Sequence, residues 1–221
     1  MMGRYRGVFF DMDGTVADTI SLWDHIIGTI KSEYDLDMTV LEKSDGFNLS
    51  NEDAIRVVLE DAGRFSESLH SEILCRIDTL YEAFLASFAG LEDGICRTLE
   101  RLEEAGVKMV LVSNSSRRQV DMCLSHLGIA DFFCGTVTSD DVTEAKPSAE
   151  PYLRALEISG LDREEVVAVE DSETGARAAS AASMPCILIY DGSPVPSSPG
   201  LTAVPRHELE TCLLGLVTPS S

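Results

Sequence analysis

The sequence is poor in positive charge. Its 17 lysines and arginines face 38 acidic residues, which gives a formal net charge of -21 at pH 7. Proteins that bind nucleic acids use lysine and arginine to neutralise the phosphate backbone, and this chain has no sequence-wide positive field. The composition therefore argues against nucleic acid as a partner.

Long hydrophobic runs are also missing. No stretch reaches the roughly 18 apolar residues that a membrane span needs, and the first seven residues lack the apolar segment of a signal peptide. Hydrophobic residues make up 44% of the chain and charged residues 25%, as in ordinary globular proteins. We expect a cytoplasmic protein without a membrane partner, as a monomer, and leave a dimer open.

Paired cysteines and clustered histidines are absent as well. The six cysteines form no C-x-x-C motif, and we expect most of them to be reduced, buried thiols: Cys75, Cys96, Cys123, Cys134, Cys186 and Cys212. The four histidines are scattered without the spacing of metal ligands. A disulfide-stapled fold and a histidine metal site are both disfavoured.

Short apolar runs are present and alternate with helical patterns, which is typical of parallel strands joined by crossover helices. The predicted strands are Gly7–Phe10, Val107–Val112, Phe133–Val137, Val166–Val169 and Cys186–Tyr190. This order predicts an α/β fold with a doubly wound, mainly parallel, Rossmann-like sheet. Ligands of such a sheet gather at the carboxyl ends of its strands.

The segment from about residue 18 to 88 breaks the alternation, because it holds three helical patterns and no convincing strand. We therefore assign residues 1–17 and 89–221 to the α/β core and residues 18–88 to an inserted helical unit. Two apolar stripes at helical spacing are interpreted as core packing rather than as a pocket wall: Ile20, Trp23, Ile27, Ile30 and Tyr34, then Leu69, Ile73, Ile77, Leu80, Phe84 and Phe88. Residues 191–200 have a loop composition, and a terminal helix is expected over 207–217.

Two acids follow the first predicted strand directly. Asp11 ends this strand, Asp13 lies two residues on, and Gly14 allows a sharp turn of the backbone. Carboxylates this close repel each other unless a cation lies between them or one is protonated. A divalent metal satisfies the first condition.

Polar groups that could hold an anion follow two later elements. Ser113 and the backbone of Asn114 come after the second core strand, just before a predicted helix whose free N–H groups attract anions. Ser115 or Ser116 is expected to cap that helix. Lys146 precedes a helix and could neutralise a phosphoryl group.

Two further acids, Glu170 and Asp171, end the fourth predicted strand. Together with Asp11 and the carbonyl group of Asp13 they form a set of oxygen ligands. Magnesium prefers carboxylate and carbonyl oxygens in octahedral array. We therefore predict a Mg²⁺ site with these residues as ligands.

With these four motifs in this order, "DMDGT", "SNSS", Lys146 and "EDS", the chain resembles the haloacid dehalogenase-like superfamily of phosphohydrolases. "KPSAEPYLRALEISGL" and "VEDSETGARAASAASMPCI" are similar to its phosphoglycolate phosphatase and β-phosphoglucomutase branch, in which a helical cap follows the first motif. The insertion at 18–88 looks like that cap.

The resemblance implies a magnesium-dependent phosphomonoester hydrolase. Asp11 would be the nucleophile that forms an aspartyl-phosphate, and Asp13 the acid and base that serves the leaving group and then water. Lys146, Ser113 and Asn114 would bind the transferred phosphoryl group, and Glu170 and Asp171 would hold the metal. The substrate would be a small phosphorylated metabolite, such as a sugar phosphate or a phosphoglycolate-like acid.

Three other functions stay open. A β-phosphoglucomutase-like transfer is disfavoured because such enzymes carry a cap histidine near the position of Trp23 and a cap arginine near that of Asn51. A signalling receiver domain is disfavoured because its phospho-acceptor follows a middle strand of the chain, whereas Asp11 follows the first. A silent binder of phosphorylated ligands is disfavoured because every expected reactive position is filled.

Overall fold

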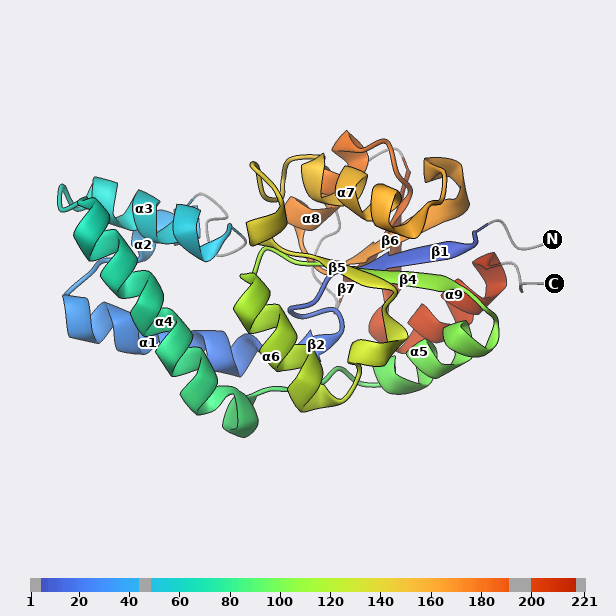
Figure 1. Ribbon diagram of the computed structural model, residues 1–221, viewed down its shortest axis with the longest axis horizontal. Coiled ribbons are helices and arrows are strands. Elements are labelled where there is room, and N and C mark those ends of the chain that lie inside the picture. Colours follow the sequence, from blue (N-terminus) through green and yellow to red (C-terminus); the bar gives the residue numbers. More distant parts are fainter. Residues whose placement is uncertain (1–4, 44–48, 191–199, 218–221) are drawn as a thin grey trace.

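A six-stranded parallel sheet forms the centre of the protein, in a computed structural model that describes residues 5–43, 49–190 and 200–217 (Figure 1). The strand order is β5-β4-β1-β6-β7-β8, and the five pairings within this sheet are all parallel. The strands are β1 (Gly7–Phe10), β4 (Lys108–Val112), β5 (Gly135–Val137), β6 (Val166–Glu170), β7 (Cys186–Tyr190) and β8 (Leu201–Pro205). The doubly wound α/β fold predicted from the sequence is confirmed.

The central strand β1 is buried on both faces of the sheet, which explains its unbroken apolar run. Val8 and Phe10 pack on one face, and Phe9 packs on the other. Two layers of helices cover these faces, α7 and α8 on one side and α5, α6 and α9 on the other (Figure 1). Their bounds are α5 (Ile95–Glu104), α6 (Arg117–Leu127), α7 (Glu150–Ser159), α8 (Glu173–Ala181) and α9 (Leu209–Leu216).

The chain changes direction across the sheet at β1. It runs from β1 to β4 and β5 on one side, and then returns to β6, β7 and β8 on the other. The connections that leave β1 and β6 therefore diverge, and a crevice opens at the carboxyl ends of these strands. The fold thus provides a ligand site where the strands end in Asp11, Ser113 and Asp171.

The helical insertion consists of α1 (Ile20–Tyr34), α2 (Thr39–Lys43), α3 (Asn51–Asp61) and α4 (Glu67–Phe88). It stands beside the sheet and its flanking helices (Figure 1). The chain enters and leaves it through a two-stranded antiparallel ribbon, in which β2 (Ala17–Asp18) pairs with β3 (Gly90–Leu91). The sequence predicted three helical patterns here and missed both the short α2 and this ribbon.

Gln119 of α6 connects the insertion to the core. Its side-chain oxygen accepts a hydrogen bond from the Asn51 amide at 3.0 Å, and its amide group donates to Asp78 at 2.8 Å. The same oxygen accepts from the backbone N–H of Ser116 at 3.2 Å. Because Gln119 is buried, these bonds fix α3 and α4 against α6.

Several predictions about local structure need correction. Strand β8 lies between the predicted loop and the predicted terminal helix, where no element was expected, and α9 begins two residues later than that helix. The predicted loop at 191–200 falls, except for Gly200, outside the described residues. The six cysteines are free as expected, but Cys75 and Cys134 are exposed rather than buried.

Further elements complete the fold. Short 3₁₀ helices cover Ala130–Phe132, Ser139–Asp141, Arg163–Glu165 and Arg206–Glu208. Within the described ranges, no helix combines the length and the apolarity that crossing a membrane requires.

The N-terminus of α6 gives a test of local stability. Ser116 is its N-cap, with its hydroxyl and the Gln119 side chain in a reciprocal capping box. We expect Ser116→Ala to lower the free energy of unfolding by about 1 kcal/mol, because backbone N–H groups of the first turn lose their acceptor. Urea denaturation measures this change. Ser125→Ala, on the exposed face of the same helix, is the control, and equal losses in both variants would contradict the capping role.

Candidate active site

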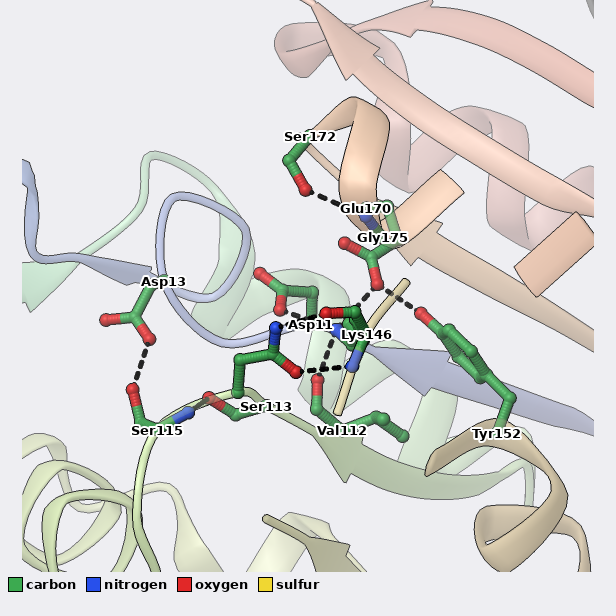
Figure 2. Close-up of polar contacts among 11 residues, drawn as sticks. Asp11, Asp13, Val112, Ser113, Ser115, Lys146, Tyr152, Glu170, Ser172 and Gly175 are labelled. Carbon is green, nitrogen blue, oxygen red and sulfur yellow. Dashed lines mark hydrogen bonds and ion pairs between the residues drawn. The ribbon is translucent and has the colours of Figure 1, made fainter. Parts of the chain in front are cut away.

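The carboxyl ends of β1, β4 and β6 bring together the polar residues that the sequence singled out. Asp11 follows β1, Ser113 follows β4, and Glu170 ends β6 with Asp171 behind it. Lys146 reaches the same place from the loop before α7. Figure 2 shows the side chains of Asp11 and Glu170 converging on the Lys146 ammonium.

Lys146 lies at the centre of the cluster and contacts two of its acids. Its ammonium donates to Asp11 Oδ1 at 2.8 Å, to Glu170 Oε1 at 2.7 Å and to the backbone carbonyl of Val112 at 2.7 Å. Only 3% of its side chain is exposed, so the ion pairs lie in a poorly hydrated environment. Burial alone would lower the pKa of Lys146, but attraction to Asp11 and Glu170 outweighs it and raises the pKa above its ordinary value. The ammonium stays charged and holds both carboxylates in place.

Asn114 and Tyr152 hold Lys146 and Glu170 in position. The Asn114 side chain brackets the Lys146 peptide, since its amide donates to the Lys146 carbonyl at 3.0 Å and its oxygen accepts from the Lys146 N–H at 2.9 Å. The fully buried Tyr152 donates its hydroxyl proton to Glu170 Oε1. Its ring lies 5.5 Å from the ammonium, within the range of a cation–π contact.

Three carboxylates of the cluster are suited to a divalent cation. Oxygens of Asp11, Glu170 and Asp171 all lie within 4.8 Å of one another. The Oε2 atom of Glu170 is buried and has no hydrogen-bond partner, which is costly for an acceptor unless a cation binds it. These residues fit Mg²⁺, which favours carboxylate oxygens.

Glycines make room for these carboxylates. Gly175 of α8 approaches Glu170 so closely that a Cβ atom there would lie 1.9 Å from Oε2. Gly14 has a φ of +76°, and a Cβ atom on it would lie 2.1 Å from Asp171 Oδ2. Larger residues at either position would displace a carboxylate from the cluster.

The pKa values of the acids reflect their crowding. The pKa of Glu170 is raised to about 7, first by burial and then by repulsion from Asp11, although Lys146 partly offsets this. Asp171 is exposed as a residue, but partial desolvation of its carboxylate at the cavity floor, and then repulsion from Asp11 and Glu170, raise its pKa to about 8. Burial also raises the pKa of Asp11, against the opposing attraction of Lys146. A bound cation would relieve this repulsion.

Asp13 points away from the carboxylate cluster, toward Ser115 (Figure 2). Its Oδ2 accepts from the Ser115 hydroxyl at 3.0 Å, and its Oδ1 accepts from the Thr19 hydroxyl at 2.7 Å and the Trp23 indole N–H at 2.9 Å. Trp23 belongs to α1, so the insertion contacts this acid directly. The contribution of the Asp13 carbonyl to a metal site stays a prediction.

The serines after β4 have distinct positions. The Ser113 hydroxyl oxygen is buried and accepts the Ser115 backbone N–H at 3.0 Å. Ser116 rather than Ser115 caps α6. Asn114 and Ser115 line the cavity, whereas Ser113 lies beneath them. The binding of phosphate by Ser113 and Asn114 stays a prediction.

A cavity of about 470 Å³ lies over the carboxylates, between the strand ends and the insertion. Its wall includes Ile20, Trp23, Ile27 and Ile30, four of the five residues in the stripe on α1. The interpretation of this stripe as core packing holds for Trp23, Ile27, Ile30 and Tyr34, which lie in the hydrophobic core or pack against it, whereas Ile20 is exposed. The fully buried residues of α1 are Leu22, Ile26 and Ile30, of which the predicted stripe contained only Ile30.

The polar residues at the start of α3 have partners within the protein. Ser50 is the N-cap of α3, and Asn51 lines the cavity and donates to Gln119. Asn48, just before them, lies outside the described residues.

Sequence reasoning missed the contacts of Tyr152, Thr19 and Ser115. Tyr152 lies in a segment whose family likeness was noted, but its spacing from Glu170 along the chain carries no signal of contact. Ser115 was considered only as a helix cap. Thr19 lies six residues after Asp13 in the sequence, and this closeness was the one signal that could have predicted its contact with the acid.

Known proteins resemble this chain in sequence. The family profile described as haloacid dehalogenase-like hydrolase matches residues 8–189. Pyrophosphatase PpaX from Bacillus velezensis is 30% identical over 178 residues, which cover 76% of this chain and 76% of PpaX.

Solved structures resemble the fold. CbbY from Rhodobacter sphaeroides, in complex with phosphate, superimposes with a TM-score of 0.77 at 22% identity, covering 92% of this chain and 93% of CbbY. β-Phosphoglucomutase from Clostridium difficile gives a TM-score of 0.73 at 20% identity, covering 85% of each chain. At these identities the likeness shows a common fold.

The raised pKa of Asp171 predicts a dependence of stability on pH. Between its ordinary pKa of 3.8 and about 8, the folded protein keeps a proton that the unfolded chain loses, so the carboxylate destabilises the metal-free fold increasingly as pH rises. Asp171→Asn should therefore be more stable than the unsubstituted protein in EDTA, by a margin that grows from about pH 5 to about pH 8.5.

Thermal unfolding at several pH values measures this margin. Asp131→Asn, an exposed acid on a 3₁₀ helix, is the matched control and should show a constant margin. Mg²⁺ should raise the melting temperature of the unsubstituted protein more than that of Asp171→Asn. A margin independent of pH, or equal stabilisation by Mg²⁺, would contradict this account of the carboxylates.

Proposed function

Because the chain belongs to the haloacid dehalogenase-like hydrolase family and is a phosphatase, we propose that it hydrolyses a small phosphomonoester with Mg²⁺ through an aspartyl-phosphate on Asp11. One observation supports this proposal most strongly. Asp11 forms an ion pair with the buried Lys146 ammonium at the floor of a cavity, and two further carboxylates lie beside it. A nucleophile, a charge-neutralising group and a candidate metal site thus share one place.

Asp11 would attack phosphorus with a carboxylate oxygen and displace the alcohol of the substrate. Lys146 holds Oδ1 of Asp11, so Oδ2 is the oxygen left for attack. Burial opposes ionisation of Asp11, and the adjacent ammonium favours it.

Asp13 would protonate the departing alcohol and then take a proton from the water that attacks the aspartyl-phosphate. Three donors, from Thr19, Trp23 and Ser115, fix the direction of its carboxylate. Two of these donors, Thr19 and Trp23, belong to the insertion, so docking of α1 and the orientation of the acid are linked.

Asp11, Glu170 and Asp171 would hold Mg²⁺, with the Asp13 carbonyl as a further ligand. The cation would supply Lewis-acid stabilisation of the charge that develops on the phosphoryl oxygens. All three N–H donors of Lys146 are directed at protein oxygens, so its influence on bound phosphate would be mainly electrostatic. Asn114 and Ser115 would contact the phosphoryl group at the cavity floor, and Ser113 would support their loop.

We further propose that residues 18–88 act as a cap that covers the site and contacts the leaving group. The chain enters and leaves this cap through the ribbon of β2 and β3, which suits a hinge. The domain limits 1–17, 18–88 and 89–221, the monomeric state and the cytoplasmic location stay predictions.

Phosphate release tests the role of Asp11. Purified protein with Mg²⁺ should release phosphate from small phosphomonoesters, and Asp11→Asn should reduce release to the background rate because the amide is a poor nucleophile. Asp61→Asn, at the exposed end of α3, is the control and should keep full activity. Unchanged turnover in Asp11→Asn, with a normal circular dichroism spectrum, would refute the nucleophile assignment.

Product analysis tests hydrolysis against transfer. With β-glucose 1-phosphate and Mg²⁺, phosphorus NMR should show inorganic phosphate if this ester is turned over at all, because water is the proposed acceptor. Accumulation of glucose 6-phosphate would instead establish mutase chemistry.

A further inference from the structure

The cavity above Asp11 has two chemically different halves. Its floor is polar and comes from the core, through residues such as Asp11, Lys146 and Asn114. Its roof comes from the insertion and is mainly apolar, with Trp23, Ile27, Met38, Leu41, Ile55 and Ile77 as its main contributors. A volume of about 470 Å³ lies within the range of small-molecule sites, so the leaving group of a bound ester would extend into this roof.

The roof offers little to a second anionic group. Of the lining residues that the structure describes, Lys146 alone carries a positive charge, and it lies in the floor. Its donors are already bound to Asp11, Glu170 and Val112. The charged residue in the roof is Asp24, which would repel a carboxylate or a second phosphate. The net charge of -21 also slows the approach of polyanions.

The roof offers equally little to a polyhydroxylated group. Its polar side chains are those of Thr19, Trp23, Asp24 and Asn51. The Asn51 amide donates to Gln119, whereas the Thr19 hydroxyl and the Trp23 indole N–H both donate to Asp13, so these groups already have partners. Several hydroxyl groups of a sugar placed against the aliphatic side chains would lose their hydrogen bonds to water without replacement.

From this juxtaposition we propose that the substrate is a phosphomonoester of an uncharged, predominantly apolar alcohol, aromatic or aliphatic. The proposal rests on the proposed function and narrows its substrate class, away from the sugar phosphate or phosphoglycolate-like acid that the family resemblance implies. The phosphoryl group occupies the polar floor, and the apolar leaving group is buried against α1, α2 and α3.

Esters of primary alcohols test this selectivity, because their leaving groups have similar intrinsic reactivity. Benzyl phosphate is compared with glucose 6-phosphate and phosphoglycolate, with pyrophosphate as a further polyanion, under Mg²⁺. The expected kcat/KM for benzyl phosphate exceeds each of the others by about tenfold or more. Comparable or higher values for the sugar phosphate, the acid or pyrophosphate overturn the proposal while leaving the phosphatase function intact.

A pair of variants on α3 tests whether the roof sets the preference. Ala54 lines the cavity and is half-buried, whereas Val57 on the same helix is equally half-buried but does not line it. Ala54→Lys should lower the preference for benzyl phosphate over phosphoglycolate by about tenfold, because an ammonium enters the apolar roof. Val57→Lys should leave the ratio unchanged, and an equal change in both variants contradicts the assignment.

Binding to Asp11→Asn distinguishes failure of the proposal from failure of the proposed function. Calorimetry with Mg²⁺ measures the affinities of benzyl phosphate and phosphoglycolate without requiring turnover. Tighter binding of benzyl phosphate supports the proposal. If the unsubstituted protein then hydrolyses none of the esters, this lack of hydrolysis refutes only the phosphatase function. Tighter binding of phosphoglycolate overturns the apolar roof as the determinant of specificity.

Discussion

The buried ammonium of Lys146 joins the end of β1 to the end of β6 through Asp11 and Glu170, and to the end of β4 through the Val112 carbonyl. One ammonium group therefore joins the carboxyl ends of three neighbouring strands. Removing the lysine would leave two buried carboxylates without a positively charged partner, which costs far more than an exposed ion pair contributes. Asn114 holds the lysine backbone and Tyr152 holds Glu170, so both support this contact.

One positive charge does not balance three carboxylates. The raised pKa values of Glu170 and Asp171 and the unpaired Oε2 of Glu170 show that the site is electrostatically incomplete without a cation or protons. The repulsion between these carboxylates is confined to the floor of the cavity. The roof carries no compensating charge among the described residues, so the molecule separates the chemistry of phosphorus from the recognition of the leaving group.

The sequence predicted the features that depend on local patterns. The apolar run of β1 required burial on both faces, and the acids that follow two strands placed Asp11 and Asp171 at one edge of the sheet. The family resemblance added Lys146 to them. The sequence could not predict contacts between residues that lie far apart along the chain. Helical periodicity predicted the packing of the stripe on α1 but not that four of its members also line the cavity. Strand β8 was missed because an edge strand needs little hydrophobic patterning.

The central claim is that Asp11 becomes covalently phosphorylated while Lys146 holds it. Borohydride reduces an acyl phosphate to an alcohol, so brief incubation with Mg²⁺ and a phosphomonoester, followed by reduction and peptide mass analysis, locates the intermediate. The account predicts that Asp11 alone among the acids of the site is reduced to the alcohol. Phosphate release with Asp11 unmodified and the reduced side chain at another acid, or at none, would contradict it.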